Sequence, residues 1–254
     1  QVASLYNEVY CVPTIVPTDN FEPVLYDGNG STQSITGVGF QPDLVWVKNR
    51  LTSAENHLLS DVASGFGKIL FSNLTNAQVG SDNTYFSQLS NGFSINTNNG
   101  NISGTNNYVA WSWKAGGAAV SNTDGTITSQ VSANVDAGFS IVKYTGNLGN
   151  ATIGHGLDEA PELVIYKSID NSRNWMVQAE ARTNTSNYLH LNLADAYANY
   201  PNYFHTTTDE TIGIQVGDPT TNAIEDYIAY AFHSVDGFSK IGSYVGNNPT
   251  SSTV

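Results

Sequence analysis

A cluster of tyrosine and asparagine side chains is the feature of this sequence whose residue types could bind a ligand. Tyr197, Asn199, Tyr200, Asn202 and Tyr203 lie close together in a turn-rich stretch that also contains a proline. Sugar-binding sites place aromatic faces against the apolar side of a sugar ring and amide groups against its hydroxyls. Most tyrosines of a β-rich chain are half-buried strand residues. The turn-rich position is therefore what makes this cluster the candidate contact with a sugar or a receptor.

Three acidic residues in polar turns have the chemistry that calcium prefers. Asp27, Asp124 and Asp209 each stand beside Gly, Asn or another acidic residue, and Ca²⁺ binds carboxylate and carbonyl oxygens. No EF-hand or nonapeptide spacing is present, and Asp-Gly pairs are ordinary turn chemistry. We therefore expect no cofactor, with calcium at these three positions as the alternative.

The sequence lacks the signatures of the common catalytic sites. No two of its five histidines have the spacing of zinc ligands. Neighbouring carboxylates such as Asp158 and Glu159 would point to opposite faces of a strand, so they do not form the facing pair of a glycosidase. Neither a phosphate-binding loop nor a Gly-x-Ser-x-Gly nucleophile turn is found. We expect a protein that is not an enzyme.

Composition excludes several classes of protein. The chain of 254 residues has 9 Lys and Arg against 22 Asp and Glu, a net charge of −13, which argues against nucleic-acid binding. A single cysteine, Cys11, excludes an internal disulfide framework. No apolar run approaches the roughly 20 residues of a membrane-spanning helix, so we expect no membrane insertion. Abundant Asn, Ser, Thr, Gly and Tyr favour β-strands joined by polar turns.

An internal repeat organises the chain. Residues 42–48 (PDLVWVK) recur as residues 161–167 (PELVIYK), and residues 108–113 (YVAWSW) recur as residues 227–232 (YIAYAF), both at an offset of 119. Tyr26 and Tyr144, each followed by a Gly-Asn pair, are related by an offset of 118. A nearly constant offset over separate blocks indicates two tandem copies of one domain.

The elements that must position these residues are short strands. Residues 44–47 and 163–166 are continuous apolar runs of strand length, which suits strands buried on both faces. Residues 194–200 are the only helical candidate, and the four tryptophans are expected in the core. The sequence therefore predicts an all-β protein of two tandem antiparallel β-sandwich repeats, of the lectin/concanavalin-like or jelly-roll type. We expect an N-terminal extension at 1–20, repeats at 21–117 and 134–237, a linker with or without an edge strand at 118–133, and a third repeat or a closing strand beginning at 238–254.

Three blocks carry a family resemblance. Residues 37–50 (GVGFQPDLVWVKNR), 108–125 (YVAWSWKAGGAAVSNTDG) and 235–247 (VDGFSKIGSYVGN) resemble repeats of tail-fibre and fibre-like virion proteins of marine tailed bacteriophages, notably phages of marine cyanobacteria. The resemblance covers residues 20–254 and implies a long multi-repeat fibre or appendage of β-sandwich modules. Residues 1–8 (QVASLYNE) are similar to the closing segment of a laminin-G/concanavalin-like sandwich, which implies a preceding sandwich domain.

The repeat and the resemblance together predict a non-enzymatic structural protein of a phage virion fibre or appendage that contributes to host-surface attachment. The alternatives are a lectin-like carbohydrate-binding module and a capsid decoration protein. We expect a virion or extracellular location, other virion proteins as partners, contact with host-surface glycans, and a homo-oligomer, for which a trimer suits a fibre. Net negative charge would keep such particles apart and soluble.

Overall fold

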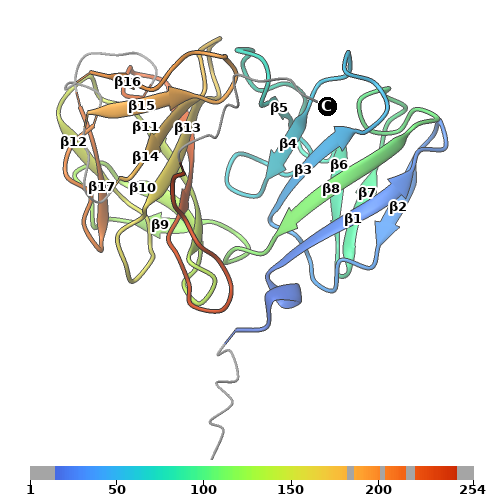
Figure 1. The fold of residues 1–254 in the computed structure, drawn as a ribbon, viewed down its shortest axis with the longest axis horizontal. Helices are drawn as coiled ribbons and strands as arrows, with labels where there is room; N and C mark the ends of the chain where they lie inside the picture. The colour runs from blue at the N-terminus through green and yellow to red at the C-terminus, as the bar shows by residue number, and fades with distance from the viewer. Residues whose placement is uncertain (1–14, 182–185, 201–203, 216–220, 245–254) are drawn as a thin grey trace, which may run out of the picture.

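The computed structural model describes residues 15–181, 186–200, 204–215 and 221–244, and this part of the chain is all-β (Figure 1). Its strands fall into two halves that lie side by side. The first half contains β1 (Phe21–Asp27), β2 (Gln33–Thr36), β3 (Leu44–Asn49), β4 (Leu58–Asp61), β5 (Leu70–Phe71), β6 (Phe86–Leu89), β7 (Gly92–Ile95) and β8 (Asn107–Trp113). The second half contains β9 (Val120–Asn122), β10 (Ser129–Asn134), β11 (Phe139–Thr145), β12 (Ala151–Gly154), β13 (Leu163–Ser168), β14 (Met176–Ala179), β15 (Asn187–His190), β16 (Ala198–Asn199), β17 (Thr211–Ile214) and β18 (Asp226–Phe232).

Each half has one large and one small antiparallel sheet. The large sheet of the first half has the order β1-β8-β3-β4-β5, and that of the second half has the order β16-β15-β14-β13-β18-β11-β10-β9. The small sheets are β2-β7-β6 and β12-β17. Starting from β1 in one large sheet and from β11, its counterpart in the repeat, in the other, the strand order is the same over five strands. Antiparallel sheets are therefore the confirmed architecture.

The apolar runs lie where they were expected. In β3, Val45 and Val47 are fully buried against the small sheet of the first half, and Leu44 is buried on the opposite face. In β13, Val164 and Tyr166 face the second half's own core, whereas Ile165 faces the first half. Both strands are covered on both faces, as continuous apolar runs of this length predict.

Matching contacts recur in the two halves. Tyr26 stacks on Tyr108 with ring centroids 5.1 Å apart, and Tyr144 stacks on Tyr227 at 5.2 Å. In both pairs the first tyrosine donates its hydroxyl to a loop carbonyl, that of Ile102 at 2.8 Å or of Thr221 at 2.7 Å. The repeated sequence blocks thus make repeated local contacts.

Besides the apolar core inside each half, a third apolar core joins the two halves. The outward faces of the two large sheets pack on each other and bury a set that we call the central core: Leu44, Leu59, Leu70, Ala115, Phe139, Ile141, Ile169, Trp175, Ile228 and Tyr230. Trp175 is fully buried just before β14, while Trp46 and Trp113 lie half-buried at the edge of this core. Trp111, on the same face, is also half-buried.

Hydrogen bonds cross between the halves beside the central core. The indole nitrogen of Trp175 donates to the Phe71 carbonyl at 2.8 Å, and the Tyr230 hydroxyl donates to Asp61 at 2.9 Å. The backbone N–H of Gln78 donates to Ile169 at 2.9 Å. The apolar contacts of the central core have no preferred direction, so these hydrogen bonds fix the angle between the halves.

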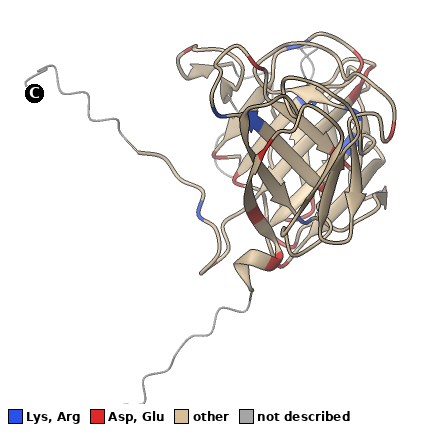
Figure 2. Ribbon diagram, turned by 90° about the vertical axis from the view of Figure 1, so that its right-hand side faces the viewer, with Lys and Arg blue, Asp and Glu red and all other residues tan. Residues whose placement is uncertain are grey.

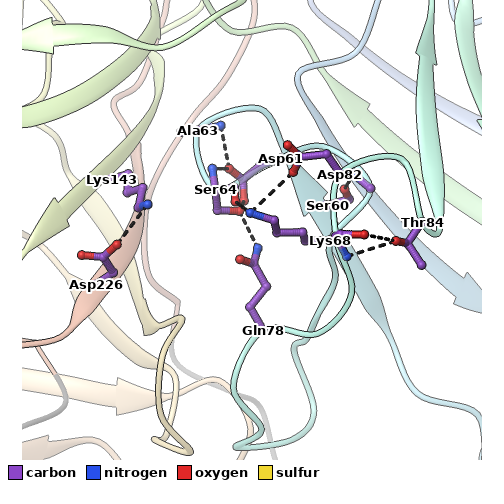
Figure 3. A network of polar contacts seen from close by, with 12 residues as sticks. Ser60, Asp61, Ala63, Ser64, Lys68, Gln78, Asp82, Thr84, Lys143 and Asp226 are labelled. Atoms are coloured by element: carbon purple, nitrogen blue, oxygen red, sulfur yellow. Dashed lines mark hydrogen bonds and ion pairs between the residues drawn. The ribbon is translucent and has the colours of Figure 1, made fainter.

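Asp61 is the centre of a buried polar network in the first half (Figure 3). One carboxylate oxygen accepts the N–H groups of Ala63 and Ser64, and the other accepts the hydroxyls of Ser64 and Tyr230. Burial raises the pKa of Asp61, and these donors act in the opposite direction. Gln78 extends the network by donating to the Ser64 hydroxyl at 2.7 Å.

Several expectations about connections change with the structure. Residues 118–133 contain β9 and most of β10, which form the edge of the eight-stranded sheet, so this segment is part of that sheet. The predicted helix at 194–200 is wrong, because this segment contains β16, which pairs with β15. Residues 238–244 contain no strand, and residues 1–14 and 245–254 lie outside the described part of the chain.

Candidate ligand-binding groove

A groove of about 730 Å³ lies on the second half, beside β14 and β15. Its lining combines tyrosine rings, carboxylates and an amide with a few aliphatic groups. The lining residues are Glu162, Ala179, Glu180, Asn187, Leu189, Tyr197, Ile241, Gly242, Ser243 and Tyr244. A groove of this volume is in the range of sites for small molecules or short oligosaccharides.

The β15–β16 hairpin positions Tyr197 and Asn187. Asn187 pairs with Asn199 across the hairpin, and the Asn199 side-chain amide donates to the Asn187 side-chain oxygen at 2.6 Å. The N–H of Tyr200 donates to Ser186 at 2.7 Å and continues the ladder. Tyr197 precedes β16 directly, is 48% exposed and lines the groove together with Asn187.

Two carboxylates form the opposite side of the lining. Glu162 accepts the N–H of Ser234 at 2.8 Å and also its hydroxyl, so its orientation is fixed. Glu180 is exposed and follows β14 with a φ of 61°, a left-handed conformation that is unfavourable for a residue with a side chain. The N–H of Ala181 donates to the Glu162 carbonyl at 2.9 Å, which keeps the two acidic residues close together at the open end of the β13–β14 pair.

The last wall comes from the segment that follows β18. Ile241 is partly buried, while the Tyr244 side chain is 93% exposed. Two tyrosine rings and two carboxylates therefore line one groove, with an amide between them. Such a groove can pack aromatic rings on an apolar ligand face and accept hydrogen bonds from hydroxyl groups.

The structure brings together only part of the predicted tyrosine and asparagine cluster. Tyr197 lines the groove, and Asn199 orients Asn187 in it. Tyr200 is 41% exposed but is not a lining residue, and Asn202 and Tyr203 lie outside the described residues. Sequence reasoning missed the carboxylates. The available signal was the repeat offset, which pairs Glu162 with Asp43. Asp43 is buried and accepts the N–H of Ala115 at 2.8 Å, as Glu162 accepts that of Ser234. Ala115 and Ser234 each lie two positions after the last strand of their half.

The predicted calcium residues lie apart. Asp27 ends β1 and accepts a hydrogen bond from the side-chain amide of Asn107. Asp124 lies between β9 and β10 and accepts one from the side-chain amide of Asn122. Asp209 precedes β17 and accepts one from the backbone N–H of Ala160. Over the described residues, no group of three or more His, Cys, Asp or Glu side chains could hold a metal ion. The calcium hypothesis thus gains no shared site at these positions.

A second polar cluster was not expected from the sequence. Lys167, fully buried at the end of β13, donates to the carbonyls of Ser168 at 2.6 Å and Asn171 at 3.3 Å. Burial lowers the pKa of Lys167 to about 8. Nearby, Arg173 and the Ser168 hydroxyl donate to Glu225, and although burial alone would raise the pKa of Glu225, these bonds lower it. Lys48, at the equivalent place in the first half, donates to loop carbonyls of Thr52 and Glu55, so the lysine stabilises the loop after its strand.

We expect Lys167 to make stability rise with pH. Its pKa is about 8 in the folded chain and 10.5 for an ordinary lysine, so between these values the unfolded chain binds more protons and unfolding becomes less favourable as pH rises. From pH 7 to 9.5 the contribution is on the order of 1–2 kcal/mol. Urea denaturation at several pH values should show this rise in the wild type and in Lys114→Met, an exposed control, but not in Lys167→Met. An unchanged pH slope in Lys167→Met would contradict the assignment.

Charged residues are sparse and spread over the molecule in the view of Figure 2.

None of the helices in the described ranges has the length and apolar character needed to cross a membrane.

Comparison with known proteins gives one match. No curated protein and no solved structure matches the chain. The model of one family, described as "Domain of unknown function (DUF7483)", matches residues 16–254, which include both halves. This chain belongs to that family of domains of unknown function.

Proposed function

We propose that this chain is a non-enzymatic structural protein of a phage virion fibre or fibre-like appendage, and that it contributes to host-surface attachment. The observation that carries the proposal is the central core, which packs the two halves on each other through the outward faces of their large sheets. Hydrogen bonds from Trp175 and Tyr230 to the first half hold the angle. A stiff body of this kind suits a spacer that holds a distal surface away from a particle.

The two halves are, in this proposal, two copies of one β-sandwich module of the lectin/concanavalin-like or jelly-roll type. The common strand order of the large sheets and the matching Tyr26–Tyr108 and Tyr144–Tyr227 stacks support it. The resemblance of residues 20–254 to tail-fibre repeats of marine phages supplies the biological setting. Other virion proteins, a homo-oligomeric assembly such as a trimer, and an extracellular location follow from that setting.

Imaging of intact particles tests the proposal. An antibody raised against this chain should label a fibre or appendage on purified phage particles, and the chain should be found among their proteins by mass spectrometry. Label on the head would instead assign the chain as a capsid decoration protein. Absence from the particles would overturn the virion assignment.

A lectin-like carbohydrate-binding module is the second candidate, and the groove beside β14 and β15 favours it. Tyr197 and Tyr244 offer aromatic faces, while Glu162, Glu180 and Asn187 offer oxygen atoms that accept hydrogen bonds from sugar hydroxyls. Weak contacts of this kind would add up when many copies of the module are carried on one particle.

A glycan array followed by titration with the best glycan tests the groove. Tyr197→Ala should weaken binding roughly tenfold or more, because it removes an aromatic contact worth about 1.4 kcal/mol. Tyr200→Ala is the matched control, since Tyr200 is on the same hairpin but does not line the groove. Equal loss in both variants would assign binding to the wider tyrosine cluster, and the absence of any bound glycan would overturn the lectin assignment.

A further inference from the structure

One corner of the five-stranded sheet has an apolar surface that the second half does not cover. This corner, which we call the open corner, consists of Pro23 and Leu25 on β1 and of Val109 and Trp111 on β8. The strand register places Pro23 beside Trp111 and Leu25 beside Val109. Leu25 is 63% exposed, Pro23 is exposed, and the other two are half-buried. We propose that two copies of this chain associate through their open corners.

The open corner is continuous with the interface that joins the two halves. On the same face, Trp111 lies beside Trp46 in the register, and Trp46 packs against the central core. The second half covers this face mainly over β3, β4 and β5, where Leu44, Leu59 and Leu70 are buried. The open corner is therefore the uncovered remainder of an interface already in use.

The equivalent positions in the second half show what covers such a face. Ile141, Ile228 and Tyr230 correspond to Pro23, Val109 and Trp111 by the repeat offset, and they are at most 2% exposed because the first half packs on them. The observed partner of this face is thus the large sheet of another module of this type. A second copy of this chain presents such a surface, and a contact between two open corners would be closed and two-fold.

Association through the face fits this corner better than pairing of strand edges. In an antiparallel pair, the backbone N–H groups of every second residue point to the partner strand. The N–H of Gly28 points to that side, because it donates to the Asn106 carbonyl. Pro23 is five positions earlier, so its nitrogen points away from β8, to the outer edge of the sheet. Proline has no N–H to donate to a further strand. The side chains of the open corner, rather than its backbone, are the groups that a partner would bury.

The second half shows which residues, placed at the open corner, would prevent association. Lys143 and Asp226 correspond to Leu25 and Asn107, and they form an ion pair of 3.0 Å. Thr145, which corresponds to Asp27, donates its hydroxyl to Asp226 at 2.6 Å. The triple variant Leu25→Lys/Asp27→Thr/Asn107→Asp therefore installs three residues that already lie together on a matching strand pair. It makes the net charge of the chain less negative, so any loss of association cannot come from greater overall repulsion between two negative chains.

Sedimentation equilibrium of the full chain tests the proposal. The wild type should approach twice the mass of one chain between about 1 and about 100 µM, and higher salt should strengthen the dimer, because screening weakens repulsion between chains of net charge −13. The triple variant should dissociate roughly tenfold or more readily, with an unchanged far-UV spectrum. Ile224→Lys, which changes a 72% exposed residue elsewhere, should dimerise like the wild type.

Three outcomes would overturn the proposal. The wild type could remain a monomer over this range, or the triple variant could dimerise as strongly as the wild type. A wild type that is monomeric, but that dimerises after removal of residues 1–14, would assign the open corner to that segment instead. None of these outcomes bears on where the chain lies in a virion, so the proposed function stands or falls separately.

Discussion

Replacing Trp175 by alanine is expected to lower the free energy of unfolding by about 3–5 kcal/mol, the usual cost of truncating a buried aromatic side chain. Trp175 is fully buried, stacks on Tyr230 with ring centroids 6.4 Å apart, and donates to the Phe71 carbonyl across the central core. Its loss would leave a cavity between the halves and an unpaired carbonyl. The two halves should then unfold in separate steps, because the contact that couples them is weakened.

Urea denaturation followed by near-UV and far-UV circular dichroism measures both effects. Trp175→Phe is the matched control, since it keeps an aromatic ring in the central core while removing the indole N–H bond and part of the ring volume; its cost should be clearly smaller. A loss below about 1 kcal/mol in Trp175→Ala, with a single transition, would show that this residue does not couple the halves.

Replacing Asp61 by alanine is the second large expected effect, again about 3–5 kcal/mol. The carboxylate of Asp61 is 1% exposed and accepts two backbone N–H groups and the hydroxyls of Ser64 and Tyr230. Removing it leaves these donors buried without an acceptor, and each unsatisfied donor costs about 1–3 kcal/mol. Asp61→Asn should cost much less, because one oxygen still accepts the N–H groups while the amide donates to the hydroxyls.

A double-mutant cycle with Tyr230→Phe isolates the bond between the halves. If the Asp61–Tyr230 bond contributes as the geometry indicates, the two changes together should cost less than the sum of the single changes. Asp136→Ala, at an exposed position, is the control and should change stability by less than about 0.5 kcal/mol. Additive single effects would place the contribution of Asp61 within the first half alone.

The strands were predictable because their signals are local. The apolar runs of β3 and β13 depend only on neighbouring residues, and the structure has a strand at each of them. The segment 194–200 shows the converse. Its composition favoured a short helix, but pairing of Ala198 with Tyr188 in β15 decided for a strand. Strand pairing is a contact between distant segments, and local propensity does not include it.

The candidate groove was only partly predictable for the same reason. Tyr197 was found because a tyrosine and asparagine cluster is visible in the sequence itself. Glu162 and Glu180 are separated from it along the chain, and β14 and β15 bring them to one side of the second half. The three aspartates considered for calcium, Asp27, Asp124 and Asp209, each bond to a different loop or strand, and the sequence alone does not show how such residues lie in space.

By itself the sequence determined an all-β chain with an internal repeat, since strand patterning and the offset of 118–119 residues are properties of the chain order. Only the tertiary structure decided how the halves meet. The outward side chains of β3, β8, β13 and β18 are mainly apolar in both halves, and such surfaces carry no record of their partner. Packing buried most of them in the central core, and hydrogen bonds at Asp61 and Trp175 fixed the angle. The open corner at Leu25 and Trp111 remained because the two faces meet off-centre.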